Sequence, residues 1–455
     1  AALGVLVSCG SVKPGEEVVA ASRDSKVVVA YVTSWSEVMP DPQYMTHINY
    51  AFGHVNESFN GVKIDNEERL RQIVDLRKQK PELKVLLSIG GWGSGRFSEM
   101  AANDEYRRAF AADCARVVKE FALDGIDIDW EYPTSSMANI SSSPDDTENF
   151  TLLMQDIRAA IGNEKELTLA TVASARYIDF KAILPSVDFV NIMAYDMASA
   201  PKHHSALYPS GHSGDITSDG AVTAHLKAGV PPSKLVMGMP FYGRGGDGYP
   251  SFQDYNKVGN TDTQYTEKWD EVAQVPYLAD KNDTLVFGFE NPRSLAIKCQ
   301  YILDKDLLGG MYWDYSGDNE QGDLRRTVAE NLLGKPHKAK VLVLTERGGQ
   351  HGGFTDAGLR WLAAEGAKGN FSITEINNAR NITEAYLSQF SLVIQLDFPP
   401  YTWPKEAEDA FVKYIEEGHG GWIGFHHATL LGEFDGYPMW QWFSDFMGGV
   451  RFKNY

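Results

Sequence analysis

Short apolar runs alternate with amphipathic stretches from residue 27 to about residue 333. The runs are typical of buried strands, and the stretches between them carry apolar residues at helical spacing. The expected strands are Val27–Val32, His47–Phe52, Lys84–Ile89, Gly125–Trp130, Leu167–Val172, Phe189–Tyr195, Leu235–Phe241 and Gly310–Trp313. The expected helices include Glu67–Lys80, Glu105–Ala122, Asp146–Ile161 and Pro292–Leu303. Eight strands with intervening helices predict a (β/α)8 barrel of the TIM type, with a doubly wound open sheet as the structural alternative.

The pattern resets near Gly334, where the basic segment Gly334–Lys340 predicts a linker. The segment VLVLTERGGQHGG that follows predicts a strand and a glycine-rich loop. Further elements are expected at Thr355–Glu365 (helix), Leu392–Asp397 (strand), Pro404–Glu417 (helix) and Gly421–His426 (strand). This order predicts a second α/β domain with an open, flavodoxin-like parallel sheet. Because RFKNY follows without an obvious finishing element, we expect this domain to be truncated.

Length, charge and cysteine content limit the classes of protein to which the chain can belong. The chain has 455 residues, 43% of them hydrophobic and 23% charged, as in soluble proteins of two or three domains. Its formal net charge of −19 argues against nucleic-acid and anionic-membrane partners, because their phosphates would be repelled. Three cysteines, Cys9, Cys114 and Cys299, can form neither a disulfide framework nor a four-thiolate metal site. The two in helical segments are expected to be buried apolar residues.

The N-terminal segment AALGVLVSCG reads as the end of a signal peptide. Its residues Leu6–Gly10 resemble a bacterial lipobox, which implies a lipid anchor on Cys9 and a place in the bacterial cell envelope or on the cell surface. The alternative is a frayed apolar terminus. Ser11–Ser25 reads as a tether, so the predicted organisation is residues 1–26 for signal remnant and tether, 27–334 for the barrel and 335–455 for the second domain.

Carboxylates occupy alternate positions of the segment FALDGIDIDWEYP, residues 121–133. Side chains of a strand alternate between its two faces, so Asp127, Asp129 and Glu131 share one face. The apolar residues of the other face are Ile126, Ile128 and Trp130. The outer face of a barrel strand packs on helices, so the three acids should point into the lumen, with Glu131 nearest the C-terminal rim. Asp124 has the outward parity and is expected to have a structural role.

Ionisation of all three carboxylates in a confined space costs electrostatic free energy. At least one of them should therefore have a raised pKa, and the three should titrate together. A carboxylic acid that stays protonated near neutral pH can donate a proton. A solvated acidic patch and a Ca²⁺ or Mg²⁺ site are the alternatives. A patch does not need apolar residues between the acids, and a metal would more naturally draw its ligands from several loops.

Aromatic residues gather at the same expected rim. Each lies at or just after the C-terminal end of a predicted strand: Tyr31, Trp35, Phe52, Trp92, Tyr195, Tyr242 and Trp313. Any one of them could be core packing. Together they predict a carbohydrate-binding cleft above the acids, because aromatic faces suit the C–H faces of sugar rings.

The segment DGIDIDWE at residues 124–131 resembles the DGxDxDxE signature of glycoside hydrolase family 18, the chitinases and related endo-β-N-acetylglucosaminidases. Four further segments match that family's strand motifs in the expected order, and the resemblance covers about residues 27–333. They are Ser88–Gly91 (SIGG), Met193–Asp196 (MAYD), Gly238–Arg244 (GMPFYGR) and Gly310–Trp313 (GMYW). Part of the long connection between Arg244 and Gly309, Tyr265–Phe289, resembles a shortened form of the family's insertion domain between strands seven and eight.

The resemblance implies a retaining, substrate-assisted hydrolysis of β-1,4 linkages between N-acetylglucosamine residues. It makes Glu131 the acid that protonates the leaving oxygen. Asp129 and Tyr195 would hold the attacking 2-acetamido group, and Asp127 would be coupled to Asp129 from below. The implied substrate-binding residues are Tyr31, Phe52, Ser88, Trp92, Met193, Asp196, Tyr242, Arg244 and Trp313. No cofactor or metal is expected. The alternatives are an endo-β-N-acetylglucosaminidase acting on N-glycans and a chitin-binding lectin without activity.

Residues 340–455 resemble the N-terminal part of a ThuA-like domain of glutamine-amidotransferase-like fold. The resemblance rests on VLVLTERGGQHGG, YIEEGHGGWIGFHHATLLG and MGGVRF. The turn Gly424–Ala428 has no cysteine, so thiol amidotransfer is not expected. His351, His426 and His427 could form a metal or sugar site, but the sequence alone favours loop histidines with local partners.

Overall fold

The computed structural model describes residues 26–246, 248–258, 264–334, 339–347, 351–369, 371–431 and 436–449. The chain divides into two compact units, with the boundary between Gly334 and Lys335. The expected lipobox and tether at residues 1–25 lie outside the described residues. Among the helices of the described part, none combines the length and the apolar composition that a membrane crossing requires.

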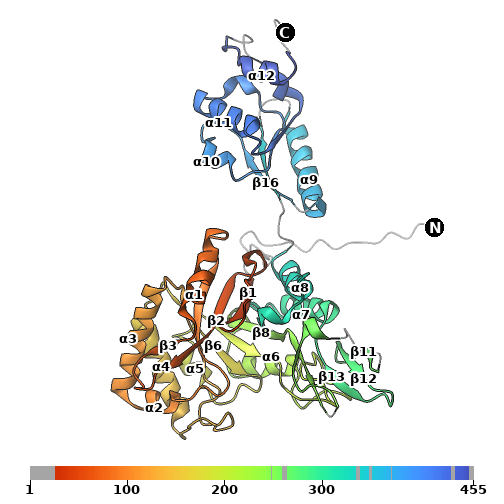
Figure 1. The fold of residues 1–455 in the computed structure, drawn as a ribbon. Coiled ribbons are helices and arrows are strands. Elements are labelled where there is room, and N and C mark those ends of the chain that lie inside the picture. The colour runs from red at the N-terminus through yellow and green to blue at the C-terminus, as the bar shows by residue number, and fades with distance from the viewer. Residues whose placement is uncertain are drawn as a thin grey trace, which may run out of the picture. The chain divides into compact units, whose positions relative to one another are not determined.

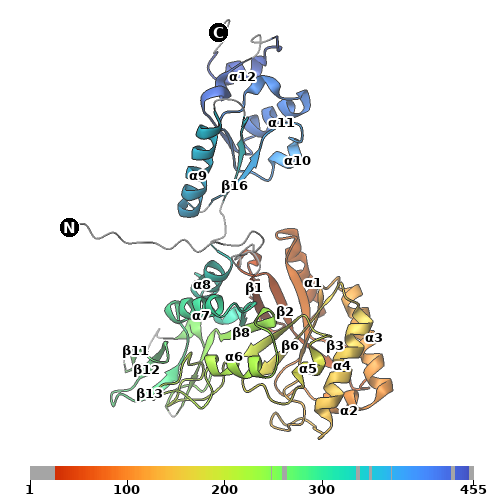
Figure 2. The same ribbon diagram turned by 180° about the vertical axis from the view of Figure 1, so that it is seen from behind.

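The first unit is a closed barrel of eight parallel strands (Figures 1 and 2), as predicted. In spatial order they are β1 (Val27–Thr33), β14 (Gly309–Trp313), β8 (Leu235–Pro240), β7 (Phe189–Met193), β6 (Glu166–Val172), β5 (Gly125–Asp129), β4 (Lys84–Gly90) and β2 (His47–Val55). Pairing of β1 with β2 closes the ring, and the short strand β3 (Val62–Ile64) adds antiparallel to β2. The open-sheet alternative is therefore excluded.

Several expected strands end earlier than predicted, and two of them carry residues of the expected site. β5 ends at Asp129 and β7 at Met193, so Trp130 and Tyr195 lie just beyond their strands. The β4–β5 ladder stops at the pair Gly90–Asp129. Gly90 has φ +130°, a conformation that favours glycine, and a Cβ atom there would lie 2.0 Å from the carbonyl oxygen of Asp129. The chain leaves the sheet at this point, which frees the following residues to form the rim.

Helices surround the barrel and cover its outer, apolar face (Figure 2). They are α1 (Glu67–Val74), α2 (Phe97–Ala102), α3 (Asp104–Glu120), α4 (Asp146–Ile161), α5 (Phe180–Ile183), α6 (Ser218–Lys227), α7 (Pro292–Asp304) and α8 (Asp323–Leu332). The prediction for α1 was too long, because the helix tightens into a 3-10 turn at Asp75–Lys78. Cys114 and Cys299 are both buried in this layer.

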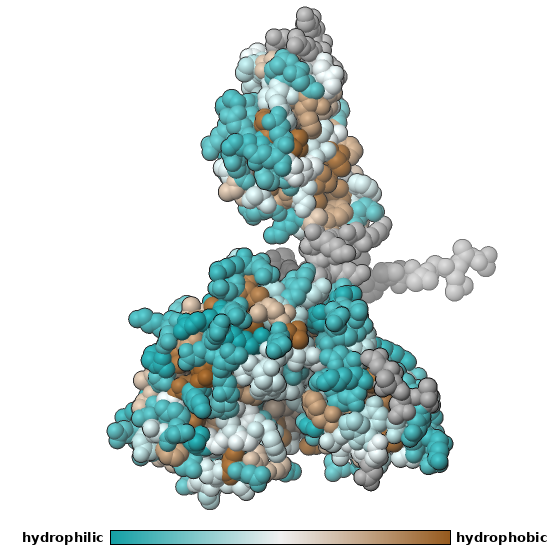
Figure 3. Space-filling model, in the orientation of Figure 1, coloured by the Kyte–Doolittle hydropathy of each residue, from teal (hydrophilic) through white to brown (hydrophobic). Residues whose placement is uncertain are grey.

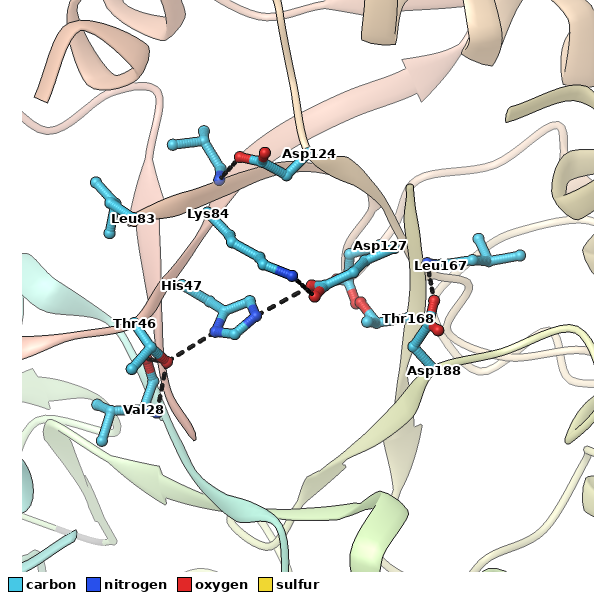
Figure 4. Close-up of polar contacts among 12 residues, drawn as sticks. Val28, Thr46, His47, Leu83, Lys84, Asp124, Asp127, Leu167, Thr168 and Asp188 are labelled. Atoms are coloured by element: carbon cyan, nitrogen blue, oxygen red, sulfur yellow. Dashed lines mark hydrogen bonds and ion pairs between the residues drawn. The ribbon is translucent and has the colours of Figure 1, made fainter. Parts of the chain in front are cut away.

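The N-terminal end of the barrel is closed by polar contacts (Figure 4). His47 points into the ring, where its Nδ1 lies 2.7 Å from Thr46 Oγ1 and its Nε2 lies 3.0 Å from Glu166 Oε2. Asp124 has the structural role expected of it, because its Oδ2 accepts a hydrogen bond from the Val85 N–H at 2.7 Å. The contact of His47 with Glu166 links β2 to β6 across the ring, and that of Asp124 with Val85 links β5 to its neighbour β4, both at the end away from the expected site.

The insertion after β8 is larger than the sequence predicted, because it includes the strand that directly follows Phe241. Five strands form its antiparallel sheet, in the order β10 (Gln253–Asp254), β9 (Tyr242–Gly245), β13 (Leu285–Gly288), β12 (Val275–Ala279) and β11 (Thr266–Asp270). Leu278, Phe287 and Phe289 form its small core. Tyr242 and Arg244 belong to β9, so the insertion itself supplies two of the expected site residues.

The second unit is an open parallel sheet, as predicted, with order β16 (Phe371–Ile376), β15 (Ala339–Leu344), β17 (Leu392–Gln395) and β18 (Gly421–Gly424). Its helices are α9 (Gly352–Gly369), α10 (Glu384–Leu387), α11 (Lys405–Glu416) and α12 (Gln441–Phe446). The edge strand β16 was not predicted. Apolar residues gather on the side of this unit that α9 occupies (Figure 3), where Phe354 and Trp361 are exposed.

Candidate active site

Asp127 lies at the centre of the barrel, completely buried on β5. Its carboxylate accepts four hydrogen bonds, each from a different strand. The donors are Tyr31 Oη (2.8 Å), Ser88 Oγ (2.8 Å), Thr168 Oγ1 (2.6 Å) and Asn191 Nδ2 (3.3 Å). Burial raises the pKa of Asp127, and the four donors oppose this shift because they favour the charged form. Asp127 is therefore held rigidly and cannot itself reach a ligand.

Asp129 comes next on the same face and has a different environment. It is buried, but its Oδ1 has no hydrogen-bond partner among the residues that the structure describes. Burial, followed by the charges of Glu131 and Asp127, raises the pKa of Asp129 well above its usual range. A buried acceptor without a partner is costly. Asp129 is consequently poised to accept a hydrogen bond from a ligand or to share a proton with its neighbours.

Glu131 lies two residues beyond the end of β5 and is almost completely buried. Burial raises the pKa of Glu131 to about 7, and the nearby charge of Asp196 acts in the same direction. In a substantial fraction of the molecules, the Glu131 carboxyl group is therefore protonated at neutral pH. This is the property that a general acid needs.

The loop that follows Glu131 is anchored by Asp146, a fully buried residue in the first turn of α4. Its Oδ1 accepts from Ser98 Oγ at 2.7 Å, and its Oδ2 accepts from the backbone N–H groups of Thr134 (3.1 Å) and Ser143 (2.7 Å). The rim segment that carries Glu131 is therefore fixed to α2 and α4.

The SIGG segment allows a close approach around the acids. A Cβ atom on Gly91 would lie 2.6 Å from the ring of Phe52, and the residue has φ +93°, where side chains are strained. Glycine here lets Phe52 stack on Trp313, with ring centroids 5.6 Å apart and planes at 20°. Tyr31 packs on the same indole at 5.6 Å. The Trp313 side chain is thereby supported as part of the cleft floor.

Asp196 and Arg244 form the opposite side of the site. Arg244 donates from Nε to Asp196 Oδ1 at 2.7 Å and from Nη2 to Oδ2 at 2.6 Å. Partial burial would raise the pKa of Asp196, but the hydrogen bonds from Arg244 and His204 hold it well below its usual range. Asp196 therefore stays ionised and adds a fixed negative charge near Glu131.

A cleft of about 660 Å³ lies above the acids. Ten of its 22 lining residues are aromatic, and Trp35 and Trp92, 65% and 61% exposed, lie at its margin. The predicted site residues that line it are Tyr31, Phe52, Trp92, Asp129, Glu131, Met193, Tyr195, Asp196, Tyr242, Arg244 and Trp313. Asp127 and Ser88 do not line the cleft but lie beneath it. Residues that come from nearly every barrel strand are thus brought to one surface.

Tyr195 presents its hydroxyl group to this cleft with little else to bind. Among the described residues its Oη contacts Met311 Sδ at 3.7 Å. Burial raises the pKa of Tyr195 well above its usual range, so the hydroxyl group keeps its proton and can donate it in a hydrogen bond.

Several residues of the site were not predicted from the sequence. Thr168 and Asn191 could have been found, because each is a polar residue at an inward position of a largely apolar strand. Tyr132 and Tyr177 line the cleft as a stacked pair with centroids 5.5 Å apart, and Phe252 stacks on Tyr242 at 4.7 Å. These three lie on loops, where no periodic signal exists.

Comparisons with known proteins agree with this geometry. The family model described as "Glycosyl hydrolases family 18" matches residues 27–318, and the one described as "Trehalose utilisation" matches residues 340–455. The chain is similar to Chitinase A1 of Niallia circulans, with 29% identity over 426 residues that cover 70% of this chain and 60% of that protein. It is also similar to Chitotriosidase-1 of Mus musculus, with 31% identity over 65% of this chain and 74% of that protein.

Two solved structures extend the comparison. The glycoside hydrolase family 18 N-acetylglucosaminidase from Paenibacillus barengoltzii matches with a TM-score of 0.63 and 32% identity, over 67% of this chain and 99% of that one. The Group IV chitinase of Ostrinia furnacalis in complex with allosamidin matches with a TM-score of 0.60 and 29% identity, over 68% and 96%.

Proposed function

Because the chain belongs to glycosyl hydrolases family 18 and is a glycoside hydrolase, we propose that it cleaves β-1,4 linkages between N-acetylglucosamine residues, as found in chitin and chitooligosaccharides. The relatives named chitinase and chitotriosidase support this substrate class. So does the aromatic cleft, whose ring faces suit a chain of sugars.

The proposed reaction begins with a proton transfer. Glu131, with its pKa raised to about 7, protonates the glycosidic oxygen as the bond to C1 breaks. The carbonyl oxygen of the substrate's own 2-acetamido group attacks C1 and forms an oxazolinium ion, so the protein supplies no nucleophile. Glu131, now ionised, then removes a proton from water as the water oxygen attacks C1, and the bond between C1 and the acetamido oxygen breaks so that the acetamido group is restored. The product keeps the β configuration.

Two side chains hold the acetamido group during this sequence. Asp129 accepts a hydrogen bond from its N–H and offsets the positive charge that grows on the ring, and Tyr195 donates to its carbonyl oxygen. Asp127 tunes Asp129 from below. The observation that carries the proposal is the buried Oδ1 of Asp129, which has no partner in the described structure and lies next to an acid of raised pKa.

The test is a product analysis on chitooligosaccharides of defined length, with a high-mannose glycopeptide in parallel. We expect hydrolysis of the chitooligosaccharides with the β anomer formed first, as followed by proton NMR. Glu131→Gln should lower turnover by a factor of about 10² to 10⁴ while oligosaccharide binding persists.

Other outcomes would overturn the proposal in distinct ways. Hydrolysis of the glycopeptide alone would identify an endo-β-N-acetylglucosaminidase that acts on N-glycans. Binding without hydrolysis of either substrate would indicate a lectin. Formation of the α anomer first would exclude the substrate-assisted mechanism.

A further inference from the structure

The second unit has the strand order of open α/β sheets that bind ligands at one edge. Its central strand β15 is followed in the chain by β16 on one side and then by β17 on the other. The connections that leave β15 and β17 therefore diverge at the carboxyl ends of these strands, where ligands of such folds are bound. Functional residues of this unit should be sought there.

Three histidines lie together beyond the carboxyl ends of β15 and β18. His351 precedes α9, and His426 and His427 directly follow Phe425 beyond β18. Each ring offers a nitrogen, and these nitrogens all lie within 4.8 Å of one another. Ring centroids are 4.7 Å apart for His351–His426, 4.5 Å for His351–His427 and 4.1 Å for His426–His427.

The rings have few other partners. His427 Nδ1 lies 3.4 Å from Glu346 Oε2, whereas the rings of His351 and His426 make no hydrogen bond to the residues that the structure describes. The structure therefore disfavours the simpler expectation of loop histidines with local partners.

Hydrogen bonds and an ion pair hold the residues next to the three histidines in place. Asp397, buried beyond β17, accepts from the Glu346 N–H at 2.7 Å and from Thr355 Oγ1 at 2.6 Å. One carboxylate thus ties the loop that carries Glu346 to the first turns of α9. The cation on that loop, Arg347, is paired with Glu375, with Nη2 and Oε2 2.7 Å apart, so its charge is compensated.

We propose that His351, His426 and His427 bind one divalent transition-metal ion of the zinc class, with a fourth position open to water or to an oxygen ligand. Imidazole nitrogens suit Zn²⁺ and its neighbours rather than Mg²⁺ or Ca²⁺. Three histidines with an open position are a known zinc arrangement. In tetrahedral coordination the ligand nitrogens are about 3.3 Å apart, so the rings must close slightly. His426 is exposed and His351 and His427 are half-buried, so rotation of the rings can achieve this.

Glu346 would act through His427. Its carboxylate orients the ring by accepting from the Nδ1–H group, which leaves Nε2 for the metal. Asp397 holds Glu346 in turn. The site would therefore have the outer hydrogen bonds that well-built metal sites possess.

The test uses the full chain after treatment with a chelator and dialysis. Titration with Zn²⁺ followed by calorimetry, with metal content by mass spectrometry, should show one equivalent bound. Co²⁺ should give the visible absorption of a four-coordinate ion. His351→Ala and His426→Ala should each weaken binding at least 100-fold, and Glu346→Gln should weaken it about 10- to 100-fold.

His419→Ala is the matched control, because this exposed histidine of the same unit pairs instead with Glu417. It should bind the metal as the parent chain does. Far-UV circular dichroism shows that each variant is folded. The proposal is overturned if the parent chain takes up less than one equivalent, or if His419→Ala weakens binding as much as His351→Ala does.

Discussion

Arg244 binds both carboxylate oxygens of Asp196, from Nε at 2.7 Å and from Nη2 at 2.6 Å. The first residue belongs to the insertion strand β9, and the second follows β7 of the barrel. This pair keeps Asp196 ionised, and the Asp196 charge contributes to the raised pKa of Glu131. The insertion thus acts on the acid of the barrel through a charge that it holds in place.

The first prediction concerns the pH profile of the parent enzyme. Glu131 works in its protonated form, so activity should be full well below its pKa and fall as pH rises through it. With the pKa of Glu131 raised to about 7, kcat/KM on a chitooligosaccharide should decline above about pH 7, by about tenfold per pH unit. Measurement of kcat/KM from pH 4 to pH 10 checks this. A profile flat to pH 9 would contradict the assignment of Glu131 as the titrating acid.

The second prediction removes the charge of Asp196. In Asp196→Asn the neighbouring negative charge is lost and Arg244 is released, and both changes favour ionised Glu131. The pKa of Glu131 should fall, so the alkaline limb of kcat/KM should move to lower pH. Turnover at pH 7 should drop about 10-fold or more, since Asp196 also lines the cleft.

Glu164→Gln is the control for this change, because it removes one exposed negative charge of the same unit. Its pH profile should match that of the parent. An alkaline limb that stays in place in Asp196→Asn would show that Asp196 does not act on Glu131 electrostatically.

The third prediction tests the support of Asp127. Thr168→Val keeps the shape of the side chain and deletes the donor at 2.6 Å from Asp127. A hydrogen bond to a charged group contributes about 1.5–3 kcal/mol, so kcat should fall about 10- to 100-fold with little change in KM. Steady-state kinetics on a chitooligosaccharide measure both constants.

Thr171→Val is a matched control on the same strand. Thr171 is also buried, but it faces away from the lumen and bonds His225 Nε2 at 2.8 Å. This variant should lose stability and keep its kcat. Equal losses of kcat in the two variants would mean that the effect of Thr168 is general to β6.

The chemistry of the site could be predicted where it follows the period of a strand. Alternation and the apolar outer face assign Asp127, Asp129 and Glu131 to the inner side; in the structure Asp127 lies among the strands, and Asp129 and Glu131 line the cleft above it. The same rule applies to Thr168 and Asn191. They were missed because one uncharged polar residue in a largely apolar strand gives a weaker signal than a row of three carboxylates.

Other features could not be predicted because they depend on which segments the fold brings together. The ion pair of Arg244 and Asp196 joins the insertion to a barrel loop. The positions of these two residues in the sequence do not predict that they form a pair. The sequence suggested the histidines at 351 and 426–427 as a possible metal or sugar site, but the fold is needed to show that they meet, because β15 and β18 end at the same edge of one sheet. The edge strand β16 was missed because its segment FSITEI is too polar to be read as a buried strand.

The last prediction concerns the buried ion pair of Lys298 and Glu290, both fully inaccessible to solvent. Lys298 Nζ contacts Glu290 Oε1 and also donates to the Ser205 carbonyl oxygen at 2.5 Å, while Ser205 Oγ donates to the same Glu290 oxygen at 2.6 Å. This network joins α7 to the segment that holds His204, the partner of Asp196. Lys298→Met leaves a carboxylate buried without its counter-charge and should lower the free energy of unfolding by about 3–5 kcal/mol.

The double variant Lys298→Met/Glu290→Leu removes both charges and should recover most of that loss, because apolar residues of similar volume often replace a buried pair at little cost. Urea unfolding of the full chain, with loss of hydrolysis marking the barrel transition, measures the differences. Lys257→Met, which breaks a surface pair with Asp254, should cost no more than about 1 kcal/mol. If the double variant is as unstable as Lys298→Met alone, the loss comes from packing around the lysine side chain, and the electrostatic explanation is wrong.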